Sequence, residues 1–125
     1  MQINEKLIPK LKEIDVNTQS ISNITGKILW TNPNPTSEIT TDTQMTLSSN
    51  DYDVLKIYSR LSLTNFYMLT NEVLKGYGTR IYYGTNYRPI NRNNDTSYTI
   101  SPANDGQGNV VIPLYVVGYK IGLFN

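Results

Sequence analysis

Two asparagine–proline steps follow a short apolar run in the stretch 28–36, which reads ILWTNPNPT. Each proline fixes its own φ angle, lacks an N–H group and moves the preceding asparagine away from the helical region, so a helix cannot pass through this stretch. Trp30, the only tryptophan of the chain, lies directly before the turn. We therefore expect a short strand followed by an extended surface segment, with Trp30 in a structural role at the end of the domain or at a seam between subunits.

The segment 1–25, before this turn, has the pattern of an amphipathic helix. Its apolar side chains recur at steps of three, four or seven and are Leu7, Leu11, Ile14, Ile21 and Ile24. Pro9 is tolerated only in a first helical turn, so the helix is expected to begin near residue 8, and Gly26 is a natural stop. An isolated helix of this length is marginal. Its apolar stripe therefore either covers the chain's own domain or, as the seven-residue spacing favours, joins copies in a coiled coil through this oligomerisation set.

From residue 26 onward the pattern has the period of two that is typical of β-strands. Strands are expected at 27–30, 40–47, 54–61, 65–69, 79–83, 96–100 and 110–117. Residues 70–75 fit either a helical turn or a strand, and Pro113 indicates an edge position or a bulge in the last strand. The sequence thus predicts a mainly β protein, with an antiparallel, jelly-roll-like β-sandwich in 26–125 after the N-terminal helical segment.

The composition of the 125 residues excludes most catalytic chemistry. The chain has no histidine and no cysteine, which removes Ser-His-Asp and Cys-His nucleophiles, thiolate redox chemistry and nearly all zinc sites. With 11 Lys+Arg against 10 Asp+Glu, a net charge of +1 gives no electrostatic reason to bind nucleic acid or an anionic membrane. We therefore predict no catalytic residue, no cofactor and no metal.

Carboxylate pairs are the remaining route to catalysis or to a hard-metal site. Asp51 and Asp53 lie two residues apart and are the best pair of this kind. Aspartate and asparagine side chains also stabilise turns by bonding to nearby backbone, and we favour that interpretation for this pair. The asparagine-rich segments 93–95 and 104–106 are likewise predicted to be turns, because they lack the ordered acidic spacing of a calcium loop.

Tyrosine is the dominant aromatic residue, with ten tyrosines against two phenylalanines. The densest combination of tyrosine and arginine gives a candidate recognition surface, which consists of Arg80, Tyr82, Tyr87, Arg88 and Arg92. Such side chains can stack on sugar rings or contact another protein. Tyr83 is left out, because neighbouring residues of a strand point to opposite faces. Ordinary sheet packing and contacts between subunits are the alternative explanation.

Several motifs resemble a known class of protein. They are Leu29–Thr36, Thr46–Ser49, Asp51–Asp53, Lys75–Thr79, Ile112–Tyr115 and Gly118–Gly122. In this order they are similar to the C-terminal β-domain of small virion proteins from tailed bacteriophages, over about four-fifths of the chain. The resemblance implies a non-enzymatic structural protein, exposed as a fibre, tail or head appendage, that contributes to assembly and to host attachment.

The resemblance also implies partners and a location. It predicts a homotrimer, made in the host bacterial cytoplasm and built into the virion, that contacts other virion proteins and has a host cell-surface glycan as a candidate ligand. The alternative is a carbohydrate-binding β-sandwich module, which would be monomeric and would bind sugar. An enzyme that acts through Asp51 and Asp53 is the third and least favoured hypothesis.

Overall fold

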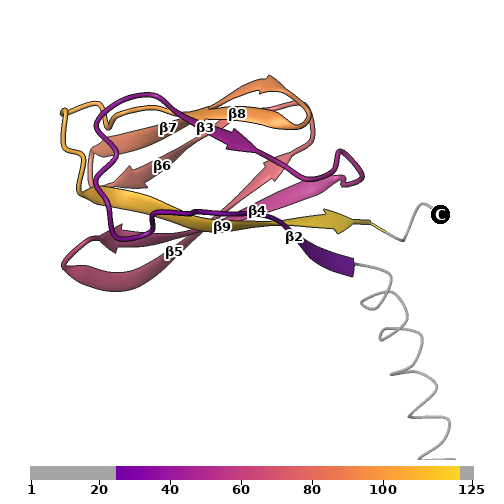
Figure 1. The fold of residues 1–125 in the computed structure, drawn as a ribbon, viewed down its shortest axis with the longest axis horizontal. Helices are drawn as coiled ribbons and strands as arrows, with labels where there is room; N and C mark the ends of the chain where they lie inside the picture. The colour runs from indigo at the N-terminus through magenta and orange to yellow at the C-terminus, as the bar shows by residue number, and fades with distance from the viewer. Residues whose placement is uncertain (1–24, 122–125) are drawn as a thin grey trace, which may run out of the picture.

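The computed structural model describes residues 25–121, which form two antiparallel four-stranded sheets arranged as two layers (Figure 1). The first sheet has the order β2-β9-β4-β5, with β2 at Thr25–Thr31, β9 at Val110–Lys120, β4 at Val54–Ser62 and β5 at Asn65–Leu74. The second has the order β3-β8-β7-β6, with β3 at Thr43–Thr46, β8 at Ser97–Ile100, β7 at Asn86–Asn94 and β6 at Thr79–Tyr83. Among the described residues, no helix is long and apolar enough to cross a membrane.

The chain passes repeatedly between the two layers. Only the β4–β5 hairpin and the consecutive strands β6, β7 and β8 stay within one sheet, and the other connections cross over. The first two described strands pair with the last two, β2 with β9 and β3 with β8. Segments far apart in the sequence therefore lie side by side, as Figure 1 shows for β2 and β9.

The hydrophobic core lies between the layers. Leu55 and Ile57 of β4 and Val116 of β9 contribute from the first sheet, and Met45 of β3 and Ile90 of β7 contribute from the second. All five are buried, and each stabilises the fold by roughly 1.5–3 kcal/mol through burial of apolar surface. The expectation of a mainly β protein with antiparallel sheets is confirmed, whereas the jelly-roll-like topology stays a prediction.

Most of the predicted strands are confirmed. The segments 27–30, 54–61, 79–83 and 110–117 lie within β2, β4, β6 and β9. Residues 70–74, for which a helical turn was the alternative, continue β5. The strand expected at 40–47 is shorter, and the nine-residue β7 was not predicted at all.

Pro113 matches one of the two positions that were predicted for it. β9 lies between β2 and β4, but its pairing with β2 ends at Tyr115, so Pro113 is paired only on its β4 side. The predicted bulge is confirmed, because the residue opposite β4 steps from Tyr115 at Tyr58 to Pro113 at Ser59. A bulge locally interrupts the ladder, which lets a residue without an N–H group lie inside a paired strand.

The predicted N-terminal helix lies outside the described residues. The same holds for the candidate oligomerisation residues Leu7, Leu11, Ile14, Ile21 and Ile24. Their role in joining copies of the chain stays a prediction.

Candidate recognition surfaces

Three residues of the candidate recognition surface lie together on the outer face of β6 and β7. Tyr82 is paired with Tyr87 across the two strands, and their ring centroids are 5.3 Å apart. Arg80, two residues before Tyr82, places its guanidinium carbon 4.3 Å from the centroid of the Tyr87 ring. Tyr82 is 54% exposed. These residues, the β6–β7 cluster, form an outward platform of the kind that stacks on a planar or apolar ligand.

Arg88 does not belong to that surface, and its predicted recognition role is wrong. It lies opposite Ile81 on the face of the sheet that points into the core, and it is fully buried. Burial lowers the pKa of Arg88, because the interior penalises the charged guanidinium. A side chain enclosed in this way cannot contact a ligand.

The guanidinium of Arg88 instead acts as a brace between loops. It donates to five backbone carbonyls, those of Ile39, Ser101, Gly108, Val110 and Val111, at 2.7–3.1 Å. An arginine side chain has five N–H donors, so its bonding capacity is used completely without a carboxylate partner. The bonds connect the segment before β3, the segment after β8 and the start of β9 at one end of the two layers.

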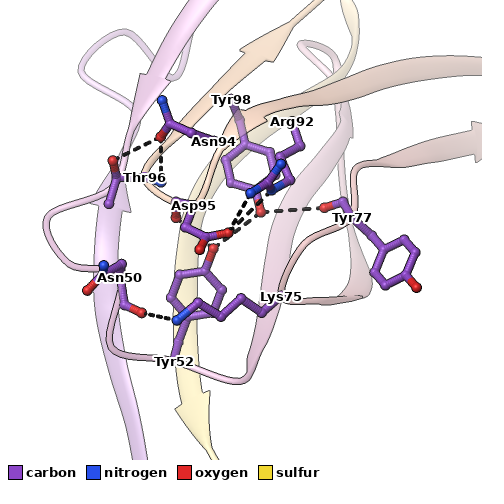
Figure 2. A network of polar contacts seen from close by, with 9 residues as sticks. All are labelled: Asn50, Tyr52, Lys75, Tyr77, Arg92, Asn94, Asp95, Thr96 and Tyr98. Carbon is purple, nitrogen blue, oxygen red and sulfur yellow. Dashed lines mark hydrogen bonds and ion pairs between the residues drawn. The ribbon is translucent and has the colours of Figure 1, made fainter.

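Arg92 lies in a different environment from the β6–β7 cluster. Its guanidinium forms an ion pair with Asp95 at 2.8 Å, next to the buried pair Tyr52 and Tyr98 (Figure 2). The Tyr52 hydroxyl donates to the Asp95 carbonyl at 2.6 Å and lies 3.3 Å from the Tyr98 hydroxyl. Burial is the main cause that raises the pKa of Tyr52, and the hydrogen bond with Tyr98 adds to it. This network is structural, because it satisfies buried hydroxyls.

Arg92 nevertheless meets Arg80 at one place on the surface. Both side chains line a depression of about 500 Å³ beside the turn 76–78. Figure 2 shows that the exposed ring of Tyr77, which belongs to this turn, is directed away from the Tyr52–Tyr98 pair. The structure therefore brings four of the five candidate residues to adjoining parts of the surface, and it excludes Arg88 from that surface.

The carboxylates of Asp51 and Asp53 hold the end of β9. Asp51 pairs with Lys120 at 3.0 Å, and Asp53 accepts a hydrogen bond from the backbone N–H of Ile121 at 2.8 Å. They contact a distant strand, which differs from the local turn bonds expected of them. Within residues 25–121, no group of three or more acidic side chains is placed to hold a metal ion.

The segment 104–106 contains a turn, as predicted, whereas Asn93 and Asn94 are the last residues of β7 and only Asp95 of the segment 93–95 lies in the turn to β8. Asn94 accepts hydrogen bonds from the backbone N–H and the hydroxyl of Thr96, at 2.9 and 3.1 Å (Figure 2). Asp105 accepts from the N–H of Gln107 at 3.1 Å and from the Tyr83 hydroxyl at 2.7 Å. Burial and this bond raise the pKa of Tyr83 to about 12, and the same bond lowers the pKa of Asp105.

A cleft that the sequence analysis did not predict lies beneath the asparagine–proline turn. Its volume is about 430 Å³, and we call it the Trp30 cleft. Its lining comes from the end of β2, the segment 32–39, β3 and β8, and consists of Trp30, Asn32, Pro33, Asn34, Ser37, Glu38, Ile39, Thr43, Gln44 and Ile100. Trp30 also packs against the core, as its expected structural role requires. The feature of the sequence that could have indicated this cleft is the single tryptophan directly before a rigid turn.

Comparison of the chain with protein-family models, with curated proteins and with solved structures found no match.

Proposed function

We propose that the chain is a non-enzymatic structural protein of a bacteriophage virion, exposed as part of a fibre, tail or head appendage. It assembles as a homotrimer that contacts other virion proteins and contributes to host attachment. The observation that carries the assembly role is the distribution of exposed apolar side chains. Of the seven large hydrophobic residues that are exposed in the described part of the chain, five lie on β2 and β5, and these are Ile28, Phe66, Tyr67, Met68 and Leu74.

β2 and β5 are the two edge strands of the first sheet. An edge strand presents unpaired backbone N–H and C=O groups, and an apolar edge is a surface that other chains pair with. In the described residues, β5 pairs only with β4, and the side chains of Phe66 and Tyr67 are 69% and 65% exposed. Coverage of this edge in an assembly removes apolar surface from water, which supports the proposed role.

The start of β5 is held in one conformation. The guanidinium carbon of Arg60 lies 3.8 Å from the centroid of the Phe66 ring, and Arg60 also donates to the carbonyls of Ser62 and Leu63 at 2.9 and 3.0 Å. A fixed apolar surface costs less entropy to bury than a mobile one. The β4–β5 hairpin is therefore suited to a permanent contact.

The location in the virion can be tested on particles of the phage that encodes the chain. Antibody fragments raised against residues 26–125 are expected to decorate intact purified particles at one type of appendage, as seen by electron microscopy. Particles in which the gene is deleted serve as the control. Particles that contain no copy of the chain, as judged by mass spectrometry, would contradict the proposal.

The second candidate function is a carbohydrate-binding β-sandwich module. The specific observation in its favour is the Trp30 cleft, which combines an aromatic side chain with several amide, hydroxyl and carboxylate groups. A solitary binding module would be monomeric, whereas the virion role requires an oligomer. The mass of the chain in solution separates the two.

A further inference from the structure

We infer that the Trp30 cleft binds a neutral saccharide. This inference deepens the attachment part of the proposed function and rests on the domain being exposed. It assigns a ligand to a site other than the tyrosine and arginine surface. The ligand class follows from the lining of the cleft, from its charge and from the way its walls are held.

The lining offers an apolar surface to the faces of a sugar ring. Trp30 is only partly buried, and the part that packs against the core fixes its position. Exposed Pro33 adds further apolar surface to the same cavity, whereas Ile39 and Ile100, which also line it, are buried. Tryptophan combines a large rigid face with low conformational entropy, which suits stacking on the C–H groups of a pyranose.

Polar groups in the same cavity match sugar hydroxyls. Gln44 donates through Nε2 to the Ser97 hydroxyl at 2.6 Å, which leaves its carbonyl oxygen as an acceptor. Glu38 is exposed, and no residue in 25–121 forms an ion pair with it. Asn34 and Ser37 supply further donors and acceptors. A cavity of about 430 Å³ with this mixture lies within the range of about 300–1,000 Å³ for small-molecule sites.

The charge of the cleft selects against acidic sugars. No lysine or arginine is among the lining residues, and Glu38 is the one ionisable side chain there. A uronate or a phosphorylated sugar would bring a second negative charge close to Glu38 without a compensating cation. The depression lined by Arg80 and Arg92 contains two positive charges and no acidic side chain, so the two sites are not suited to the same ligand.

The walls of the cleft are fixed before any ligand binds. At the start of the segment 32–39, the side-chain amide of Asn32 donates to the Pro113 carbonyl at 2.8 Å, and the backbone N–H of Asn32 donates to the Leu114 carbonyl at 2.8 Å. At the other end, Ile39 donates to the Gly108 carbonyl at 2.9 Å and accepts from buried Arg88 at 2.9 Å. A preorganised site does not lose affinity to loop ordering.

The single tryptophan gives a direct readout. We expect titration of the purified full chain with galactose, glucose, N-acetylglucosamine or N-acetylgalactosamine to change the fluorescence of Trp30 in a saturable way for at least one of the four. Galacturonate and glucuronate are the acidic probes, and each is expected to bind at least tenfold more weakly than the neutral sugar that binds best. Two-dimensional NMR of the Gln44 side-chain amide gives a second readout that does not depend on Trp30.

Two variants and one control locate the binding. Glu38→Ala and Gln44→Ala are expected to weaken the affinity about tenfold each, which corresponds to about 1.4 kcal/mol and to one lost hydrogen bond. Glu72→Ala, an exposed glutamate on β5, is expected to leave the affinity unchanged. Thermal melts of all three check that each variant is folded.

The inference is overturned if none of the four neutral sugars gives a saturable change in either readout. It is also overturned if Glu38→Ala and Gln44→Ala bind the sugar as tightly as the unmodified chain does, or if a uronate binds as well as the best neutral sugar. A trimeric, virion-bound chain that does not bind sugars would contradict this inference but not the proposed function. A monomeric chain that binds sugars would contradict the proposed assembly but not the sugar site in the Trp30 cleft.

Discussion

The side chain of Arg88 connects the loops at one end of the molecule. Its five hydrogen bonds join three segments that are separated by up to about 70 residues in the sequence. One of these segments, 32–39, lines the Trp30 cleft. Sequence alternation places Arg88 in a strand but does not say which face is buried. An arginine at an inward position is uncommon, so the surface assignment was the natural expectation and was wrong.

Replacing Arg88 by methionine is expected to unfold the domain. The substitution keeps an unbranched, apolar side chain but removes five hydrogen bonds to backbone carbonyls. The Gly108 carbonyl still accepts from the Ile39 N–H, and each buried carbonyl that is left without a donor costs about 1–3 kcal/mol. A domain of this size is stable by only about 5–15 kcal/mol. Circular dichroism is expected to show loss of the cooperative melt. Arg80→Met is the matched control and should melt within a few degrees of the unmodified chain; a similar small shift for Arg88→Met would contradict the brace.

Tyr83 and Asp105 give the molecule a defined sensitivity to alkaline pH. Burial and the hydrogen bond to Asp105 raise the pKa of Tyr83 to about 12, above its usual value of about 10, so the folded chain holds this proton more tightly than the unfolded chain does. The stabilisation is complete below pH 10 and is lost as the pH rises through about 12.

We therefore expect the free energy of unfolding, measured with denaturant, to fall above pH 10, and to fall less steeply in Tyr83→Phe. Tyr82→Phe, the exposed neighbour on the opposite face, is the control and should keep the slope of the unmodified chain. Equal slopes for the unmodified chain and Tyr83→Phe would show that burial and the Asp105 contact do not hold the proton.

At the scale of elements, the strands that could be predicted are those with regular periodicity. β4 alternates buried and half-exposed residues along most of its length, and its limits were found almost to the residue. β7 was missed because its inward positions are occupied by Arg88 and Ile90, with Pro89 between them and four polar residues after them. A charged residue in the core position and a proline both remove the signal on which strand prediction depends.

The candidate site was predictable only in part, for the same reason. The β6–β7 cluster was found because its residues are close in sequence and share one hairpin. The Trp30 cleft joins β2, the 32–39 segment, β3 and Ile100, and it exists only once β2 lies on β9 and β3 on β8. Pairings between such distant strands are not encoded in local spacing.

The end of β9 supplies a prediction at this scale. Asp51→Asn combined with Asp53→Asn is expected to lower the melting temperature by only a few degrees, because the amide oxygen still accepts from Ile121 and an ion pair as exposed as Asp51–Lys120 contributes little. Asp53→Ala removes the acceptor and should cost more. Infectivity should be unchanged in the double variant. A large loss of adsorption with intact folding would mean that the carboxylates bind metal or act chemically.

At the scale of the whole molecule, the proposed assembly rests on the two-layer β-domain, on its apolar sheet edges and on the amphipathic helix that the sequence predicts in residues 1–25. The chain carries no histidine or cysteine, and in the described residues Asp51 and Asp53 are engaged in structural contacts. Together with the exposed apolar side chains of the edge strands β2 and β5, these contacts are the basis of the proposed structural role.

The mass of the full chain in solution tests this assembly most directly. Light scattering at micromolar concentration is predicted to give three times the 14.2 kDa of one chain. The trimer of the double variant Phe66→Ser, Tyr67→Ser is predicted to dissociate at higher concentration than that of the unmodified chain. Tyr77 is 64% exposed but lies off the sheet edge, so Tyr77→Ser is predicted not to change the dissociation. A mass of 14.2 kDa for the folded, unmodified chain would contradict the account.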